Sequence, residues 1–215
     1  MTTTPSRTSV HTLLTCGIVA GPLYIAVTAI QMLTRDGYDI RRHAASLLSN
    51  GDLGWIQITN FVVTGLMMVA MAVGLRRTLS PGKGATWAPR LVGVYGLGMI
   101  AAGVFRADPA FGFPAGAPAG APNPMSWHGA LHFIVAGVGF LALIAACFVF
   151  ARRFAALGAR RWAVYSVLTG VVFFAAFAGI ASGSSNLTIP FAVAVVLAWA
   201  WASALAAHLR TRSNA

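Results

Sequence analysis

The sequence predicts an all-α fold, a bundle of six membrane-spanning helices. Of the 215 residues, 58% are hydrophobic and only 9% are charged, whereas soluble domains carry about 25% charged residues. The mean hydropathy is +0.76, and the apolar residues fall into six separate stretches. A chain this poor in charge is neither a soluble enzyme nor a disordered protein. No stretch alternates as a barrel strand does, so the spans are helices, which satisfy their own backbone hydrogen bonds in lipid.

Each apolar stretch is long enough, or nearly so, to cross a hydrocarbon core of about 30 Å, which takes about 20 helical residues. Only Arg7 is basic before the first stretch, whose apolar run is longer than a signal-peptide core, so we interpret it as an uncleaved span. The third stretch is the shortest. The last two are separated by Ser184, Ser185 and Asn186 and should form an antiparallel hairpin. The expected spans are 11–33, 55–75, 91–107, 127–150, 162–184 and 187–207, within a membrane domain of 11–207, and the tails are 1–10 and 208–215.

The charges indicate how the bundle is oriented. Eleven of the 15 Lys and Arg residues lie in the tails and in the second and fourth connections. The remaining four, Arg35, Arg41, Arg42 and Arg106, lie on the other side with all four acidic residues. The positive-inside rule therefore places both termini in the cytoplasm, in a multi-pass protein of the plasma membrane. A net charge of +11 would suggest nucleic acid in a soluble protein. Here the basic residues are scattered in pairs at helix ends, so we expect membrane lipids as partners and no nucleic acid. Nothing in the sequence indicates the oligomeric state.

The two long outer connections differ in character. In the first, 34–54, Ile40, Ala44, Ala45, Leu47 and Leu48 recur at nearly helical spacing, which predicts a short amphipathic helix at the outer interface. The other, between the third and fourth spans, contains the sequence AGAP twice, at 115–118 and 119–122. Proline and glycine at this density block helix and strand, so we expect an irregular flap over the outer mouth.

Polar residues gather at the outer end of the spans, where burial in lipid makes them costly. Gln57, Asn60 and Thr64 share one helical face, since they are three and then four residues apart. The inner halves of the spans are almost wholly apolar. We therefore expect an outward-facing polar pocket that binds a lipid-like or amphipathic small molecule, in an accessory or transport-type role. Arginine would suit a phosphate group there. The ligand-binding candidates are Arg41, Arg42, His43, Gln57, Asn60 and Arg106.

A second hypothesis is an intramembrane metal-dependent hydrolase. His128 and His132 are one helical turn apart, a spacing that permits both imidazoles to hold one zinc ion. Asp108 and His43 are further possible ligands, and an open position would activate water. The catalytic candidates are then His128, His132, Asp108 and Ser46. The alternative is structural: His128 caps and snorkels at the interface, His132 hydrogen-bonds inside the bundle, and Asp108 pairs with an arginine. Whether the protein is an enzyme stays open.

Four segments carry a resemblance to a known family. They are LLTCGIVAGPLYIAV, GYDIRRHAASLLSNGDLGWIQITNF, GVFRADPAFGFPAG and SWHGALH. Together they resemble the bacterial domain-of-unknown-function family 998, over about residues 11–207. The resemblance implies a multi-span membrane protein and supports the six-span architecture. It implies no activity and no catalytic residues.

Overall fold

A computed structural model describes residues 7–79, 81–183 and 185–212. Six long helices account for most of them, and each contains or overlaps one expected stretch. All six are long and apolar enough to cross a membrane, and the described residues include no strand beyond one isolated bridge between Ala110 and Phe113. The all-α, six-helix prediction is confirmed. The helices are α1 (Arg7–Thr34), α2 (Gly54–Thr78), α3 (Trp87–Val104), α4 (Trp127–Ala156), α5 (Arg160–Ala181) and α6 (Thr188–Arg212), with short 3-10 helices η1 (Ala45–Ser49) and η2 (Ser185–Leu187).

Helix boundaries differ most from expectation at α3 and α6. The third span was expected at 91–107, but the helix runs from Trp87 to Val104. Arg90, which we had placed in the connection before the span, lies in the first turn of this helix. Arg90 sits over the Trp87 ring, 5.6 Å from its centroid. Helix α6 continues to Arg212, so most of the expected tail 208–215 is helical.

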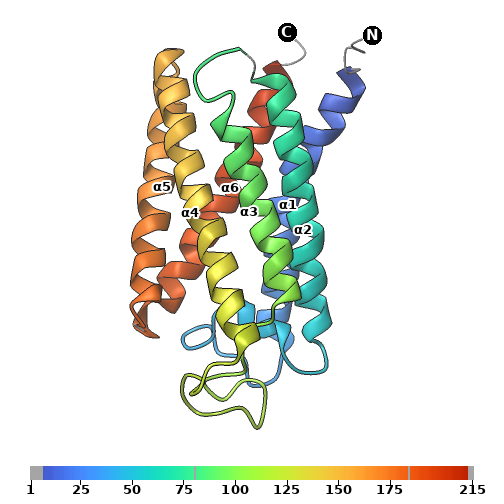
Figure 1. Ribbon diagram of the computed structural model, residues 1–215, viewed down its shortest axis with the longest axis vertical. Coiled ribbons are helices and arrows are strands. Elements are labelled where there is room, and N and C mark those ends of the chain that lie inside the picture. The colour runs from blue at the N-terminus through green and yellow to red at the C-terminus, as the bar shows by residue number, and fades with distance from the viewer. Residues whose placement is uncertain (1–6, 80, 184, 213–215) are drawn as a thin grey trace.

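The six helices form a closed ring. Each packs against its neighbours in the chain, and α6 packs against α1 (Figure 1). The α1–α6 contact is close because Gly21 has no side chain: a Cβ there would lie 3.0 Å from the carbonyl oxygen of Trp199 and collide with the Ser203 hydroxyl. Small residues allow such approach between helices in lipid.

Aromatic side chains fill the interior of this ring. Trp199 of α6 stacks on Tyr24 of α1 at 5.0 Å and meets Tyr95 of α3 edge-on at 5.6 Å, centroid to centroid. Trp201 packs on Phe150 of α4 at 5.7 Å. All five side chains are buried, so the ring has an aromatic core that joins helices from opposite sides.

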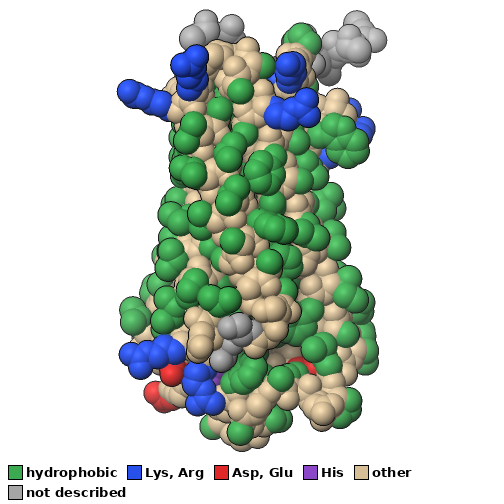
Figure 2. All heavy atoms as spheres, turned by 90° about the vertical axis from the view of Figure 1, so that its left-hand side faces the viewer, with side chains coloured by type: hydrophobic (Ala, Val, Ile, Leu, Met, Phe, Trp, Pro, Cys, Tyr) green, Lys and Arg blue, Asp and Glu red, His purple; other side chains and the backbone are tan. Residues whose placement is uncertain are grey.

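The two ends of the bundle carry different charges. One end holds the start of α1, the end of α6 and the α2–α3 and α4–α5 connections, and we call it the basic end (Figure 1). The opposite end carries the α1–α2 and α3–α4 connections, and we call it the capped end. Between them, the face seen in Figure 2 is hydrophobic. Exposed indoles lie at both borders, Trp87 at the basic end and Trp55 and Trp127 at the capped end, where membrane proteins concentrate tryptophan.

The loop at 34–54 does not form the interfacial amphipathic helix that we expected. Its regular part is η1, five residues long. Leu47 and Leu48 are buried in a small core with Ala107, Ala110 and Phe113 of the α3–α4 connection. Leu47 and Leu48, two of the five residues that suggested a membrane-facing stripe, instead pack the two connections together, so the capped end is a small folded layer.

Close helix contacts supply a first prediction. A Cβ on Gly96 of α3 would lie 2.7 Å from the carbonyl oxygen of Gly65 and 2.9 Å from the amide nitrogen of Val69, both on α2. Gly96→Ala should therefore lower the free energy of unfolding by about 1–3 kcal/mol, the usual cost of overpacking. Thermal unfolding in a mild detergent measures it.

Gly93 is the matched control on the same helix. A Cβ there would meet only the Ala72 Cβ, at an ordinary 3.5 Å. Gly93→Ala brings the same gain in helix propensity without the clash, so it should be neutral or slightly stabilising. Equal effects of the two substitutions would contradict the close α2–α3 contact.

Candidate functional site

The candidate residues at the capped end separate into two groups. Those in the first group have exposed side chains, and those in the second are buried. The exposed ones are Arg41, Arg42, Arg106 and His128. The buried ones are His43, Gln57, Asn60 and His132. We expected all of them to surround one outward-facing pocket, but the buried members are held by bonds to separate parts of the protein.

His43 joins the two connections of the capped end. Its Nδ1 accepts a hydrogen bond from the backbone N–H of Asp39 at 2.9 Å, and its Nε2 donates to the carbonyl oxygen of Phe111 at 3.0 Å. The ring packs against Tyr38 and Phe113, and the three ring centroids are each 5.4 Å from the other two. Both ring nitrogens are therefore engaged, which leaves no lone pair for a metal ion.

Asp108 holds the beginning of α4. Its carboxylate accepts hydrogen bonds from the backbone N–H of Ser126, at 2.7 Å, and from the Ser126 hydroxyl. The Ser126 hydroxyl in turn caps the helix by accepting from the N–H of Gly129 at 3.0 Å. A side chain at Gly129 would collide with this carboxylate. Asp108 thus has the architectural role that we considered, but with a serine as partner in place of an arginine.

The two histidines of α4 do not act as a pair. His132 is buried, and its Nδ1 donates to the carbonyl oxygens of Phe105, at 2.8 Å, and Ala102, at 3.1 Å. These carbonyls belong to the end of α3, where the helix leaves them without partners of its own. His128 is exposed and its ring lies 3.5 Å from that of Trp127. His132 therefore hydrogen-bonds inside the bundle, as the structural alternative to metal binding had it.

The expected metal ligands therefore do not converge. In the part of the chain that the structure describes, no group of three or more His, Cys, Asp or Glu residues is placed to hold a metal ion. Ser46, the proposed nucleophile, is half-buried, and its carbonyl accepts the Ser49 hydroxyl at 2.6 Å. Zinc binding itself stays untested.

Arg35 is a residue of the capped end that sequence reasoning missed. It follows α1 directly, and its guanidinium donates to the carbonyl oxygens of Asn50, at 2.7 Å, and Leu48, at 3.2 Å. The same group lies over the Phe113 ring, 5.3 Å from the centroid. Burial lowers the pKa of Arg35, and the nearby Asp52 carboxylate opposes this shift. In the sequence Arg35 was only one more charge outside a span, and no spacing pattern links it to its partners.

A cluster of neutral polar side chains joins α1 to α2, and we call it the polar seam. Gln57, Asn60 and Thr64 do share one buried face, but this face meets α1 and not a pocket. Gln31 Nε2 donates to Gln57 Oε1 at 2.7 Å, and Asn60 Nδ2 donates to Thr28 Oγ1 at 3.1 Å. The two α1 members belong to no pattern in the sequence and were not predicted.

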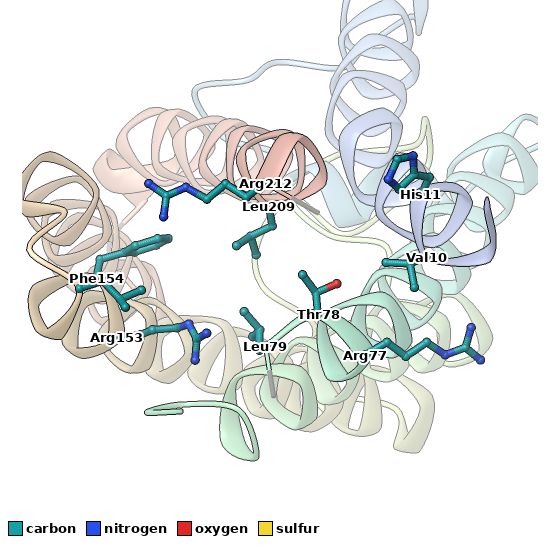
Figure 3. A pocket seen from close by; sticks show the side chains of 10 residues that line it. Val10, His11, Arg77, Thr78, Leu79, Arg153, Phe154, Leu209 and Arg212 are labelled. Carbon is teal, nitrogen blue, oxygen red and sulfur yellow. The ribbon is translucent and has the colours of Figure 1, made fainter. Parts of the chain in front are cut away.

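A pocket of about 380 Å³ opens at the basic end, the opposite end from the expected one. Figure 3 shows Leu79 and Leu209 facing the opening and Arg153 reaching toward it from α4. The lining comes from α1, α2, α4, α6 and residues that directly follow two of them. It consists of Val10, His11, Arg77, Thr78, Leu79, Arg153, Phe154, Leu157, Leu209 and Arg212.

The lining of this basic pocket is both cationic and apolar. It contains three arginines, and none of the described residues that line it is acidic. Arg153 is positioned by a 2.8 Å hydrogen bond to the carbonyl of Lys83, and Arg77 by a 2.7 Å bond to the Ser9 hydroxyl. A guanidinium carries five N–H donors, so one such bond orients it without using it up. We had interpreted these arginines only as a signal of membrane orientation, and their common place around one pocket depends on how the ring brings α2, α4 and α6 together at this end.

The comparison with known families agrees with the fold. Residues 18–208 match the model of a family described as "Protein of unknown function (DUF998)", so the chain belongs to this family. No curated protein and no solved structure matches the chain.

The two histidines His43 and His128 make a contrasting pair for a second prediction. His43→Ala removes both hydrogen bonds of the ring and leaves the half-buried N–H of Asp39 and carbonyl of Phe111 without these partners. It should lower the free energy of unfolding by about 2–3 kcal/mol. His128→Ala changes an exposed side chain and should stay within about 0.5 kcal/mol. Thermal unfolding of both variants in detergent tests this, and the opposite ranking would contradict the role of His43.

A third prediction concerns Tyr38 and alkaline pH. Its hydroxyl donates to the carbonyl oxygen of His43 at 2.6 Å, and burial raises its pKa above the usual value of 10.0. The phenol is therefore stabilising in its neutral form. The contribution of the hydroxyl to the free energy of unfolding is complete below about pH 10, the pKa of tyrosine in the unfolded chain. This contribution is lost as the pH rises above that value. Tyr38→Phe keeps the ring but removes the hydroxyl.

The stability difference between wild type and Tyr38→Phe should thus shrink between about pH 9 and 12. Unfolding of both proteins across this pH range measures it. The other tyrosines are common to both proteins and cancel in the difference. A constant difference would show that the Tyr38 hydroxyl is not protected by the folded cap.

Proposed function

We propose that this DUF998 protein binds an anionic, lipid-like amphiphile in its basic pocket. The observation that carries the proposal is the composition of one cavity, which combines three arginines with five apolar side chains. Guanidinium groups bind phosphate and carboxylate by paired, charge-assisted hydrogen bonds. Leu157, which is exposed, offers apolar surface beside these charges, and the buried side chains of Leu79, Phe154 and Leu209 complete the apolar lining. A ligand with an anionic group and a short length of hydrocarbon satisfies both parts.

The size and position of the pocket support a lipid-class ligand. Pockets for small molecules usually measure about 300–1,000 Å³, and the value of about 380 Å³ suits a head group with the first part of its chains. By the positive-inside rule, we propose that the basic end faces the cytoplasm from the plasma membrane. The inner leaflet there is rich in anionic lipid.

The lipid-like ligand that we expected from the sequence is kept in this proposal, but its site is moved. At the capped end His43, Asp108 and His132 are used to hold connections and helix ends, as their hydrogen bonds indicate. We do not propose the metal-dependent hydrolase. Three of its four candidate ligands, His43, Asp108 and His132, already hydrogen-bond to groups on different elements, and the fourth, His128, is exposed.

The fourth prediction tests ligand binding directly. A short-chain phosphatidic acid should bind the protein in non-ionic detergent saturably and raise its melting temperature. Short-chain phosphatidylcholine should not, and inorganic phosphate should bind far more weakly because it lacks the apolar part. Arg153→Gln should weaken phosphatidic acid binding about tenfold or more, the usual effect of losing a hydrogen bond to a charged group. Isothermal titration calorimetry gives the constants.

Arg160→Gln is the matched control. Arg160 is exposed at the start of α5, at the same end of the bundle, and does not line the pocket. Both variants lose one positive charge, so general attraction of anionic lipid to the basic end would change equally in both. Equal weakening, or equal binding of phosphatidic acid and phosphatidylcholine, would overturn the proposal.

A further inference from the structure

The polar seam is unusual because it is neutral, buried and close to one end of the span. Its members are Thr28 and Gln31 of α1 and Gln57, Asn60 and Thr64 of α2, each at most 5% exposed. Gln31 is three residues before the end of α1, and Asn60 is six residues after the start of α2. At 1.5 Å per residue, the seam extends roughly 10 Å or more into the bundle from the capped end.

Every side-chain amide nitrogen of the seam donates at least one hydrogen bond to protein. Gln31 Nε2 donates to Gln57 Oε1, at 2.7 Å, and to the carbonyl of Val27, at 3.3 Å. Asn60 Nδ2 contacts the carbonyl oxygen of Tyr24 at 3.2 Å, besides its bond to Thr28. Gln57 Nε2 donates to Thr28 Oγ1 at 3.4 Å. The amide nitrogens of the seam therefore all have hydrogen-bond acceptors within the protein.

Two carboxamide oxygens of the seam, Gln31 Oε1 and Asn60 Oδ1, are buried and have no hydrogen-bond partner among the described residues. Turning either amide over does not remove the deficit. Such a flip would place the oxygen of Asn60 against the Tyr24 carbonyl, or that of Gln31 against the Val27 carbonyl, and two acceptors repel. The present orientation is thus the favourable one, and the deficit is a property of the site.

We propose that the polar seam is an internal binding site for a small, neutral hydrogen-bond donor that donates to Gln31 Oε1 and Asn60 Oδ1, with water as its occupant in the membrane. An unpaired buried acceptor costs about 1–3 kcal/mol. Buried waters in proteins typically make about three hydrogen bonds, to groups that the protein alone leaves unsatisfied. Each oxygen needs one O–H group, and a water molecule has two to donate.

Charge selects against a cation at this site. The seam contains no carboxylate, and an unpaired charge is expensive to bury. Arg35 follows Gln31 by four residues and is itself positive, and its guanidinium donates to the carbonyl oxygens of Leu48 and Asn50 and not to the seam. Gln57 also lies near the N-terminus of α2, where the helix dipole disfavours positive charge. A neutral donor meets none of these costs.

The sequence makes the site accessible to a selective label. The chain contains only two glutamines, Gln31 and Gln57, and both belong to the seam. Glutamine labelled with ¹³C at its side-chain carbonyl therefore reports on nothing else. In a Cys16→Ala background, ¹³Cβ-labelled cysteine provides a dry reference, because the remaining Cys147 is 0% exposed in the core whereas Cys16 is half-buried.

The experiment is magnetisation transfer from water protons to these carbons, by solid-state NMR of the full-length protein in phosphatidylcholine bilayers. We expect the glutamine carbonyl of the seam to gain water magnetisation several-fold faster than Cys147. The carbonyl shifts should be the same in sodium, potassium and choline chloride. Gln31→Met assigns the two glutamine signals, and the result with both glutamines present decides alone if that variant does not fold.

Two results would overturn the proposal. Transfer to both glutamines that is as slow as to Cys147 would mean that the acceptors are dry. A carbonyl shift that follows the identity of the cation, and disappears in choline chloride, would assign the site to a metal cation instead. Neither result affects the basic pocket, which lies at the other end of the bundle.

Discussion

The structure depends on one constraint: in lipid, each polar group must find its partner inside the protein. Helices meet it for the backbone, but the side chains at the capped end require specific partners. His132 satisfies carbonyls at the end of α3, and Asp108 and Ser126 together satisfy the first amide groups of α4. The position of the α3–α4 connection follows from these bonds, because both of its ends are fixed by them.

The same constraint explains why the capped end is folded. Arg35 cannot remain in lipid at the end of α1 without partners, and the nearby backbone carbonyls of Leu48 and Asn50 supply them. Its position then brings the guanidinium over Phe113, which anchors the small core of the cap. His43 completes the layer through Phe111, 68 residues away in the chain. Charge, aromatic ring and histidine therefore act together across two connections.

Sequence reasoning was successful where the signal was local. Length and hydropathy identified all six spans, and the spacing of Gln57, Asn60 and Thr64 identified a shared face. It failed where the partner is remote. Nothing near His43 indicates Phe111, and nothing near Gln57 indicates Gln31. The amphipathic spacing of Leu47 and Leu48 was read as a membrane contact because a stripe of apolar residues does not reveal what covers it.

The contrast between the two ends changes how polar residues in such a bundle are interpreted. A polar side chain near a span is costly, which makes it a candidate for function, but the same cost is relieved equally well by a carbonyl of a neighbouring helix end. At the capped end the conspicuous histidines and the aspartate have such partners. At the basic end Arg77, Arg153 and Arg212, from three helices, line one cavity together with apolar side chains. Membrane orientation was a sufficient explanation of their charge, and that explanation hid the fact that they line the same cavity. In this chain the fold leaves two sets of polar groups with unused hydrogen-bonding capacity: the arginines of the basic pocket and two amide oxygens of the polar seam. These groups are therefore better candidates for function than the histidines and the aspartate of the capped end.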